Sequence, residues 1–308
     1  MTETIRITAE RIRKLEVQGA RNVAIAAVKA FQTLAEQSKT KNKTAFLNKL
    51  KEAQGILFAS RETEPLMRNA IRWIIAQVED SAAEKVDALG QIVVSNANQF
   101  LTNLDSSRER TAEIGSKRIR DGSVVFTHCH SSTVTRLLTQ AKEDGKNFKV
   151  ICTETRPAFQ GRITAKEMVE LDVETLLIVD SAARSLMTNV DLILVGADAI
   201  TSEGNVVNKI GTSAIAVLAN EARKPVYVVS ELLKFDPETL YGEYEKIEQR
   251  NPIEIWKDAP SKLVVKNPAF DVTPNKYIQG LICEEGVIAP QSIVETVHRR
   301  YPWVIKNI

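Results

Sequence analysis

The hydrophobic pattern of the chain changes its period near Asp121 and Gly122, and this change constrains the fold more than any other feature. Before it, apolar residues recur at the three- and four-residue spacing of amphipathic helices, and the alternation typical of strands is missing. After it, short runs rich in β-branched residues alternate with helical segments. We therefore expect an α/β protein with an N-terminal helical domain, residues 1–118, and a Rossmann-like domain with a doubly wound parallel sheet, residues 119–308.

Five or six helices are predicted in the N-terminal part. The helical spacing is clearest in residues Val23, Ala27, Ala30, Phe31 and Leu34. Polar residues near positions 38–42, and polar residues with a proline near 60–65, predict breaks between helices.

Five strands are predicted after the change of pattern, at residues 123–127, 149–153, 175–179, 192–196 and 226–229. Helices are predicted between them, at about residues 132–144, 164–171, 181–188 and 210–223. Because the strands are continuously apolar and helices separate them, they should form a parallel sheet covered on both faces. The tail, residues 240–308, adds one further predicted strand at 280–283.

Composition excludes several classes of function. Aromatic residues make up 6% of the 308 residues and the net charge is +2, so no nucleic-acid partner is expected. No apolar run reaches the roughly 18 residues of a membrane span, and the polar N-terminus argues against a secretory signal. The three cysteines form no CxxC pair, which favours free thiols in a reducing compartment, the cytoplasm.

Polar side chains follow every predicted strand of the main sheet. In an open α/β sheet, ligands bind beyond the carboxyl ends of the strands, so these residues define a predicted site. They include His128, Cys129, Glu154, Asp180, Asp198, Glu231 and Lys234.

Cys129 follows the first strand and is expected at a helix N-terminus, where free backbone N–H groups would stabilise a thiolate and lower the pKa. Such a thiolate could abstract a proton or act as a nucleophile. The alternative is a small buried side chain, which is the usual state of a lone cysteine. Zinc binding with His128 and His130 is not expected, because adjacent residues cannot converge on one ion and no second cluster completes a tetrahedron.

Asp198 ends the run Val-Gly-Ala-Asp after the fourth strand. A carboxylate at the mouth of an apolar strand can be partly desolvated, which raises its pKa and makes it a usable general acid. The alternative is an N-cap or turn aspartate. For Asp180, which directly precedes Ser181 and a predicted helix, capping is favoured.

Cationic residues near the same sheet edge indicate a phosphorylated ligand. Gly211 and Thr212 open a predicted helix whose N–H groups could receive an anion. No GxGxxG or GxxxxGK[ST] motif is present, so neither a dinucleotide nor a P-loop nucleotide is implied. The cations are Arg156, Arg162, Lys209 and Lys234.

Six segments, taken in order, resemble one known superfamily. They are THC at 127–129, TETRPAFQGRITAKE at 153–167, VDSAARSLM at 179–187, VGADAI at 195–200, NKIGTSAIAVLA at 208–219 and ELLKF at 231–235. The superfamily contains archaeal ribose-1,5-bisphosphate isomerase, methylthioribose-1-phosphate isomerase and the alpha, beta and delta subunits of translation initiation factor two B. With the helical N-terminal part, the resemblance extends over essentially the whole chain.

The resemblance implies that Cys129 and Asp198 are catalytic. The isomerases carry a cysteine and an aspartate in these segments, whereas the translation-factor alpha subunits typically lack the cysteine and have glutamate in place of the aspartate. The residues implied to bind substrate are Gly19, Arg21, Arg61, Ser131, Asn208, Lys209 and Lys234. One departure is the run His130-Ser131-Ser132, which lacks the lysine that the bisphosphate isomerases have after the serine.

The implied activity is conversion of ribose 1,5-bisphosphate to ribulose 1,5-bisphosphate, a step in nucleoside monophosphate degradation. Asp198 would protonate the ring oxygen and Cys129 would abstract the C2 proton, with no metal or organic cofactor. The implied partners are a sugar bisphosphate and further copies of the chain, in dimers or in hexamers. The alternatives are a non-catalytic regulatory subunit resembling the alpha subunit of translation initiation factor two B, and a methylthioribose-1-phosphate isomerase.

Overall fold

The N-terminal part is helical, as its apolar spacing predicts. The computed structural model describes residues 3–61 and 63–306. Within that part of the chain, five helices precede the first strand, and the predicted breaks near residues 38–42 and 60–65 both fall between helices. The helices are α1 (Glu3–Arg13), α2 (Ala20–Glu36), α3 (Lys43–Phe58), α4 (Pro65–Glu79) and α5 (Val86–Ser116).

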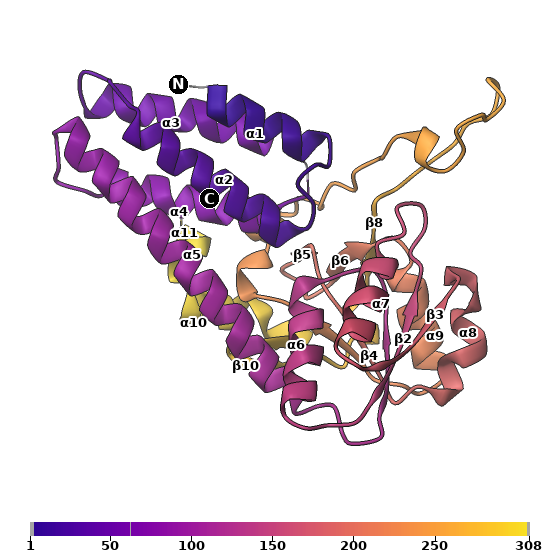
Figure 1. The fold of residues 1–308 in the computed structure, drawn as a ribbon. Coiled ribbons are helices and arrows are strands. Elements are labelled where there is room, and N and C mark those ends of the chain that lie inside the picture. The colour runs from indigo at the N-terminus through magenta and orange to yellow at the C-terminus, as the bar shows by residue number, and fades with distance from the viewer. Residues whose placement is uncertain (1–2, 62, 307–308) are drawn as a thin grey trace.

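Helix α5 connects the helical part to the sheet. It packs on α2 and α4 in its first half and continues to contact α6 (Ser132–Glu143) and β9 (Gly280–Cys283) further along (Figure 1). The length of 31 residues exceeds that of an ordinary globular helix because α5 serves two packed cores in succession.

The C-terminal part is built on a seven-stranded sheet in the order β10-β9-β7-β4-β1-β2-β3. All neighbouring strands are parallel except β9 and β10. The predicted α/β class and parallel sheet are therefore confirmed. The strands are β1 (Val124–Thr127), β2 (Lys149–Thr153), β3 (Glu174–Ile178), β4 (Leu192–Val195), β7 (Val226–Val229), β9 and β10 (Gly286–Ile288).

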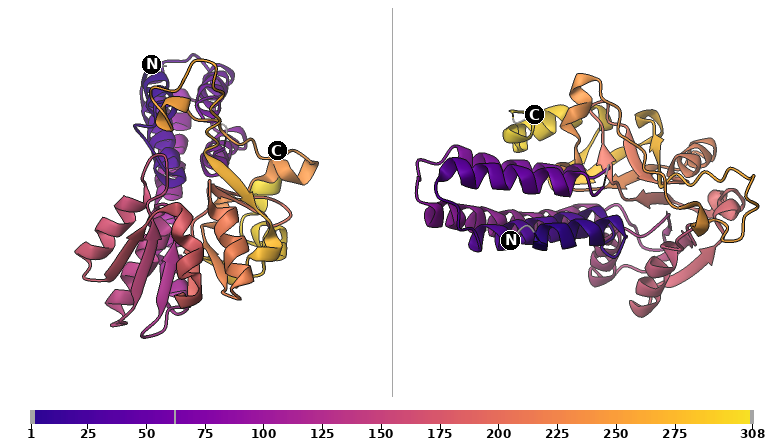
Figure 2. Two further views of the ribbon diagram at one scale, coloured as in Figure 1. Left: turned by 90° about the vertical axis from the view of Figure 1, so that its right-hand side faces the viewer. Right: turned by 90° about the horizontal axis from the view of Figure 1, so that it is seen from above.

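Both faces of the sheet are covered, because successive strand residues point to opposite sides. One face packs against α6 and α7 (Gly161–Glu170), through Val125, Val150, Leu194, Leu137 and Met168. The other face packs against α9 (Thr212–Glu221), through Phe126, Ile151, Ile193, Ile215 and Ala219. Figure 2 shows the helices on either side of the sheet.

A second, antiparallel sheet was not predicted. It consists of β5 (Ala199–Ile200), β6 (Val206–Lys209) and β8 (Phe270–Thr273). Its strands are short, and β8 pairs with β6 from more than 60 residues further along the chain, which local pattern cannot reveal. As a consequence Asn208 and Lys209 lie on a strand, and the helix predicted at 210–223 begins at Thr212 and ends at Glu221.

The segment predicted as a helix at 181–188 is not one continuous α-helix. One turn of α-helix, α8 (Ala183–Leu186), stands between two 3₁₀ turns, Asp180–Ala182 and Met187–Asn189. Among the described residues, no helix is both long and apolar enough to span a membrane.

The chain end returns to the helical part. Helix α11 (Pro302–Lys306), which follows α10 (Ile293–Arg300), contacts α4 (Figure 1), and the rings of Trp303 and Trp73 are 6.0 Å apart. Buried Asn69 of α4 donates hydrogen bonds of 2.9 Å to the carbonyl oxygens of Leu233 and Phe235 in the loop after β7. This amide therefore fixes that loop against the helical part.

We expect Asn69→Ala to lower the free energy of unfolding by about 2–6 kcal/mol, because it orphans two buried carbonyls and each costs about 1–3 kcal/mol. Urea denaturation measures the change. The exposed Asn98→Ala is the matched control and should change the free energy by less than about 0.5 kcal/mol. Equal effects of the two substitutions would contradict a fixing role for Asn69.

Candidate active site

Cys129 and Asp198 follow two strands that are neighbours in the sheet. β1 pairs in parallel with β4, with Val125 opposite Leu192 and Phe126 opposite Ile193. From β1 the chain moves outward to β2 and β3, whereas from β4 it moves the other way, to β7 and β9. The two residues thus lie at the topological switch point, where α/β sheets bind ligands.

Gly196 lets these two strand ends approach each other. A Cβ atom at this position would lie 2.7 Å from Oγ of Ser131 and 2.8 Å from its Cβ. Ser131 is the N-cap of α6, and its hydroxyl accepts a hydrogen bond of 3.4 Å from the backbone N–H of Val134. Only glycine leaves room for the start of α6 beside the end of β4.

A hollow of about 400 Å³ lies over this point, between the helical part and the sheet. It brings together most of the residues predicted to bind substrate. Those on its wall are Gly19, Arg21, Ser131, Asn208 and Lys234. Of the two residues predicted to be catalytic, Asp198 is on the wall and Cys129 is not. Lys209 instead lines an adjoining hollow of about 50 Å³, and Arg61 lines neither of the two.

Gln160 connects the two hollows to the cysteine and is not among the residues predicted to be catalytic or to bind substrate. It lines both hollows, and its Oε1 accepts a hydrogen bond of 3.6 Å from Sγ of Cys129. Its Nε2 donates a hydrogen bond of 3.4 Å to Oε1 of Gln18, in the connection between α1 and α2. The position of Gln160 in the loop after the second strand was the available signal.

The expectation of a lowered Cys129 pKa is wrong. Helix α6 begins three residues later, at Ser132, and Cys129 itself has a left-handed backbone with φ of 68°. Burial raises the pKa of its thiol to about 11, although Lys209 and the backbone N–H of His130 act in the opposite direction. Desolvation therefore outweighs the nearby positive charge.

His128 is a structural residue at the base of this loop. It is buried, its Nδ1 lies 2.6 Å from Oγ1 of Thr153, and its Nε2 lies 2.9 Å from the carbonyl oxygen of Ile210. Burial lowers its pKa. His130 lies on the wall of the larger hollow, with its Nε2 3.8 Å from Oε1 of Glu167.

The predicted anion site at the start of α9 is already occupied by a side chain. The carboxylate of Asp271 on β8 accepts hydrogen bonds from the backbone N–H groups of Gly211, at 2.8 Å, and Ser213, at 3.1 Å. The prediction failed because β8, which carries the carboxylate, could not be placed from the sequence.

Two other predictions at the sheet edge need correction. Arg156 and Arg162 do not line either hollow; both stack on the ring of Phe159, and Arg162 pairs with Glu154 at 3.2 Å. Asp180 does not cap its own helix. Its carboxylate accepts hydrogen bonds from the N–H groups of Thr155 and Arg156, at 2.8 and 2.7 Å, and so holds the loop after β2.

Arg61 lies in an internal cluster of charges. Its Nη1 is 2.8 Å from Oε1 of Glu64, and its Nε is 3.5 Å from Oε2 of Glu248. Burial raises the pKa of Glu64 to about 7, against the lowering effect of Arg61, and the charge of Asp198 adds to the rise. Arg61 is thus close enough to Asp198 for their charges to interact, without reaching the hollow wall.

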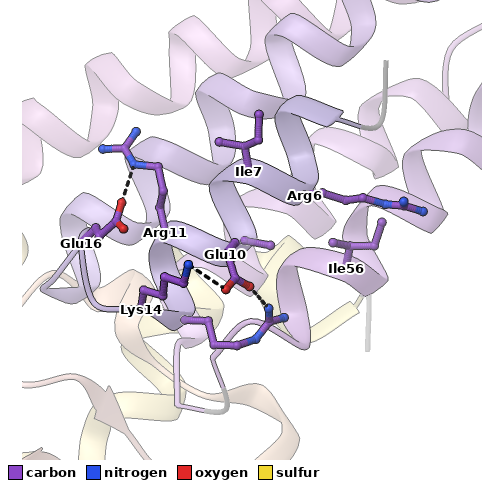
Figure 3. A pocket seen from close by; sticks show the side chains of 9 residues that line it. Arg6, Ile7, Glu10, Arg11, Lys14, Glu16 and Ile56 are labelled. Atoms are coloured by element: carbon purple, nitrogen blue, oxygen red, sulfur yellow. Dashed lines mark hydrogen bonds and ion pairs between the residues drawn. The ribbon is translucent and has the colours of Figure 1, made fainter.

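Another hollow, of about 550 Å³, lies along α1 (Figure 3). Five of its charged residues form exposed ion pairs: Arg13 and Lys14 pair with Glu10, and Arg11 pairs with Glu16. Exposed pairs of this kind are weak, and none of the predicted site residues lies on the wall of this hollow. The smaller hollow at the switch point is the candidate active site.

The fold is that of an α/β protein with a cleft between a helical part and the edge of a doubly wound sheet. The chain belongs to the initiation factor 2 subunit family, whose family model matches residues 16–290.

Two curated relatives are isomerases of sugar phosphates. Ribose 1,5-bisphosphate isomerase of Thermococcus kodakarensis is 40% identical over 305 residues, which cover 97% of this chain and 95% of the relative. Methylthioribose-1-phosphate isomerase of Desulforamulus reducens is 36% identical over 295 residues, covering 91% and 85%.

The structural relatives agree with this family. Translation initiation factor eIF-2B of Pyrococcus horikoshii superposes with a TM-score of 0.82 at 30% identity, covering 94% of this chain and 98% of that one. 5-Methylthioribose 1-phosphate isomerase of the same organism superposes with a TM-score of 0.77 at 30% identity, covering 96% and 88%.

We expect Cys129 of the unliganded protein to react slowly with iodoacetamide at neutral pH. Because the thiolate is the reacting form and the pKa is about 11, the alkylation rate should rise about tenfold per pH unit between pH 7 and pH 10. Mass spectrometry of the peptide containing Cys129 measures the rate, and Cys129→Ser gives the background. A rate that levels off near pH 7 would contradict the raised pKa.

Proposed function

We propose that this protein is an aldose–ketose isomerase that converts ribose 1,5-bisphosphate to ribulose 1,5-bisphosphate. The observation that carries the proposal is the placement of Cys129 and Asp198 after adjacent strands at the switch point, beside a cleft with buried Arg21 and Lys234. Ribose 1,5-bisphosphate as the substrate is supported by relatives of that name, which are about 40% identical over nearly the whole chain.

The substrate is a ribose whose C1 carries a phosphate, so its ring does not open through a free hemiacetal. In the proposed reaction Asp198, in its protonated form, gives a proton to the ring oxygen as the bond from that oxygen to C1 breaks. The thiolate of Cys129 takes the proton from C2, which produces an enediol phosphate ester. Proton return to C1 and loss of the C2 hydroxyl proton to the Asp198 carboxylate leave a ketone at C2.

The cleft favours the charged ligand that this reaction requires. Arg21 and Lys234 are 6% and 5% exposed and lie on the cleft wall, so a phosphate would meet cations that water screens weakly. Lys209, in the adjoining hollow, already acts to lower the pKa of Cys129. Gln160, which bonds to the thiol, would orient it toward C2.

We further propose a cytoplasmic location and a homo-oligomer, a dimer or hexamer. The location is supported by three free, buried cysteines, which suit a reducing compartment. Exposed apolar side chains on and beside the edge strand β3 support contact between copies, and they include Ile163, Leu176, Leu177 and Val179.

The test is an assay of the purified protein with α-ribose 1,5-bisphosphate, with ribulose 1,5-bisphosphate as the measured product. Cys129→Ser and Asp198→Asn should each lower kcat about 10²–10⁴-fold, since each removes a group that transfers a proton. Turnover that survives both substitutions would contradict the assigned roles.

The same assay separates the alternatives. Faster turnover of 5-methylthioribose 1-phosphate than of the bisphosphate would show that the protein is a methylthioribose-1-phosphate isomerase. Binding of a sugar phosphate without any turnover would favour a regulatory subunit.

We expect Gly196→Ala to lower kcat/KM about 10²-fold, because the added Cβ displaces Ser131 and with it the loop that carries Cys129. Gly55→Ala is the matched control. Gly55 lies within α3, and a Cβ atom added there would meet nothing within 4 Å, so activity should stay unchanged while helix stability rises slightly. Full activity of Gly196→Ala would show that the close approach of the strand ends is not required.

A further inference from the structure

One fully buried carboxylate, Glu231, connects the two cleft cations. It follows β7 and is 0% exposed. Its Oε1 lies 3.4 Å from Nη1 of Arg21 and accepts a hydrogen bond of 3.2 Å from Oγ1 of Thr133. Its Oε2 lies 3.5 Å from Nζ of Lys234. Glu231 itself is not on the cleft wall.

The three groups around Glu231 come from separate elements. Arg21 belongs to the first turn of α2 in the helical part, Thr133 to the first turn of α6, and Lys234 to the 3₁₀ turn after β7. The first turn of α6 directly follows the loop that carries Cys129. A single carboxylate therefore joins the helical part to both sides of the cleft.

Each cation is also held by a carbonyl oxygen. Nζ of Lys234 donates a hydrogen bond of 2.8 Å to Ala197, next to Asp198, and Nη1 of Arg21 donates one of 2.9 Å to Leu104 of α5. Arg21 pairs in addition with Asp105. The carbonyl oxygens leave both positive charges in place, and Asp105 contacts Arg21 but is not paired with Lys234. Glu231 is the carboxylate that pairs with both cations.

We propose that Glu231 is a positioning residue, which holds Arg21 and Lys234 in the geometry that receives a substrate phosphate. The proposal rests on the proposed function for the identity of the substrate, but the arrangement of the cations does not depend on turnover. A hydrogen-bonded carboxylate behind two cations sets their spacing, and that spacing determines whether both reach the same anion.

A positioning role and simple charge neutralisation predict opposite changes in anion affinity when Glu231 is replaced. Removing the negative charge makes the cleft more positive, so a purely electrostatic role predicts tighter binding of an anion after Glu231→Gln. A positioning role predicts weaker binding, because the cations lose their common anchor. Glu231→Asp keeps the charge and shortens the side chain, so positioning predicts weaker binding for this variant too.

Glu284 provides a matched control on the neighbouring strand end. It is buried and accepts hydrogen bonds from the backbone N–H of Leu232, at 3.1 Å, and from the hydroxyl of Tyr301, at 3.0 Å. Burial raises its pKa to about 7. Glu284→Gln thus changes a buried carboxyl beside Glu231 without touching Arg21 or Lys234.

The experiment measures inorganic phosphate binding by calorimetry and, separately, steady-state kinetics with ribose 1,5-bisphosphate. Glu231→Gln and Glu231→Asp should weaken phosphate binding and raise KM about 10- to 100-fold, the range of one or two charged hydrogen bonds, with kcat changed less than about threefold. Glu284→Gln should leave phosphate affinity and KM within about twofold. Thr133→Val removes one hydrogen bond to Glu231 and should weaken phosphate binding and raise KM by a smaller factor. This variant replaces the Glu231 variants in the test if those do not fold.

Three results would overturn the proposal. They are unchanged or tighter phosphate binding in the Glu231 variants, a fall in kcat and melting temperature with KM preserved, and failure of the wild-type protein to bind phosphate. Absence of turnover in a wild-type protein that binds phosphate would instead contradict the proposed function alone, since the calorimetric comparison still tests Glu231.

Discussion

The parallel pairing of β1 with β4 is the contact on which the rest of the site depends. It makes neighbours of two strands that are more than 60 residues apart in the chain, and the connections leave them in opposite directions. The two strand ends therefore open onto the same point of the sheet edge. Gly196 completes the arrangement, because any side chain there would meet Ser131 at the start of α6.

Burial of charge is the second constraint on the cleft. Arg21, Lys234 and Glu231 are all shielded from water, so each needs a partner in the protein. Burial alone would raise the pKa of Glu231, but Lys234, Arg21 and Thr133 help to bring it below its ordinary value. On Cys129 the same desolvation exceeds the effect of Lys209 and raises the pKa of the thiol to about 11.

Features that depend on neighbouring residues could be predicted from the sequence, whereas features that depend on distant segments could not. The helical breaks, the parallel strands and the positions of Cys129 and Asp198 at strand ends all follow from periodicity and order along the chain. The start of α9 shows the limit. Its backbone N–H groups looked free, but Asp271 of β8 occupies them from 58 residues away. A residue that faces a site from a distant strand leaves no mark on the local pattern.

The sequence by itself determined the α/β class, the helical N-terminal part and the chemical groups at each strand end. These properties depend on side-chain periodicity and on the rule that parallel strands present their carboxyl ends together. Only the tertiary structure decided which of those groups face one cleft, that Gln160 contacts the thiol, and that Glu231 lies between Arg21 and Lys234. The reason is physical: burial and partner distance set the charge state of each group, and both arise from packing between segments far apart in the chain.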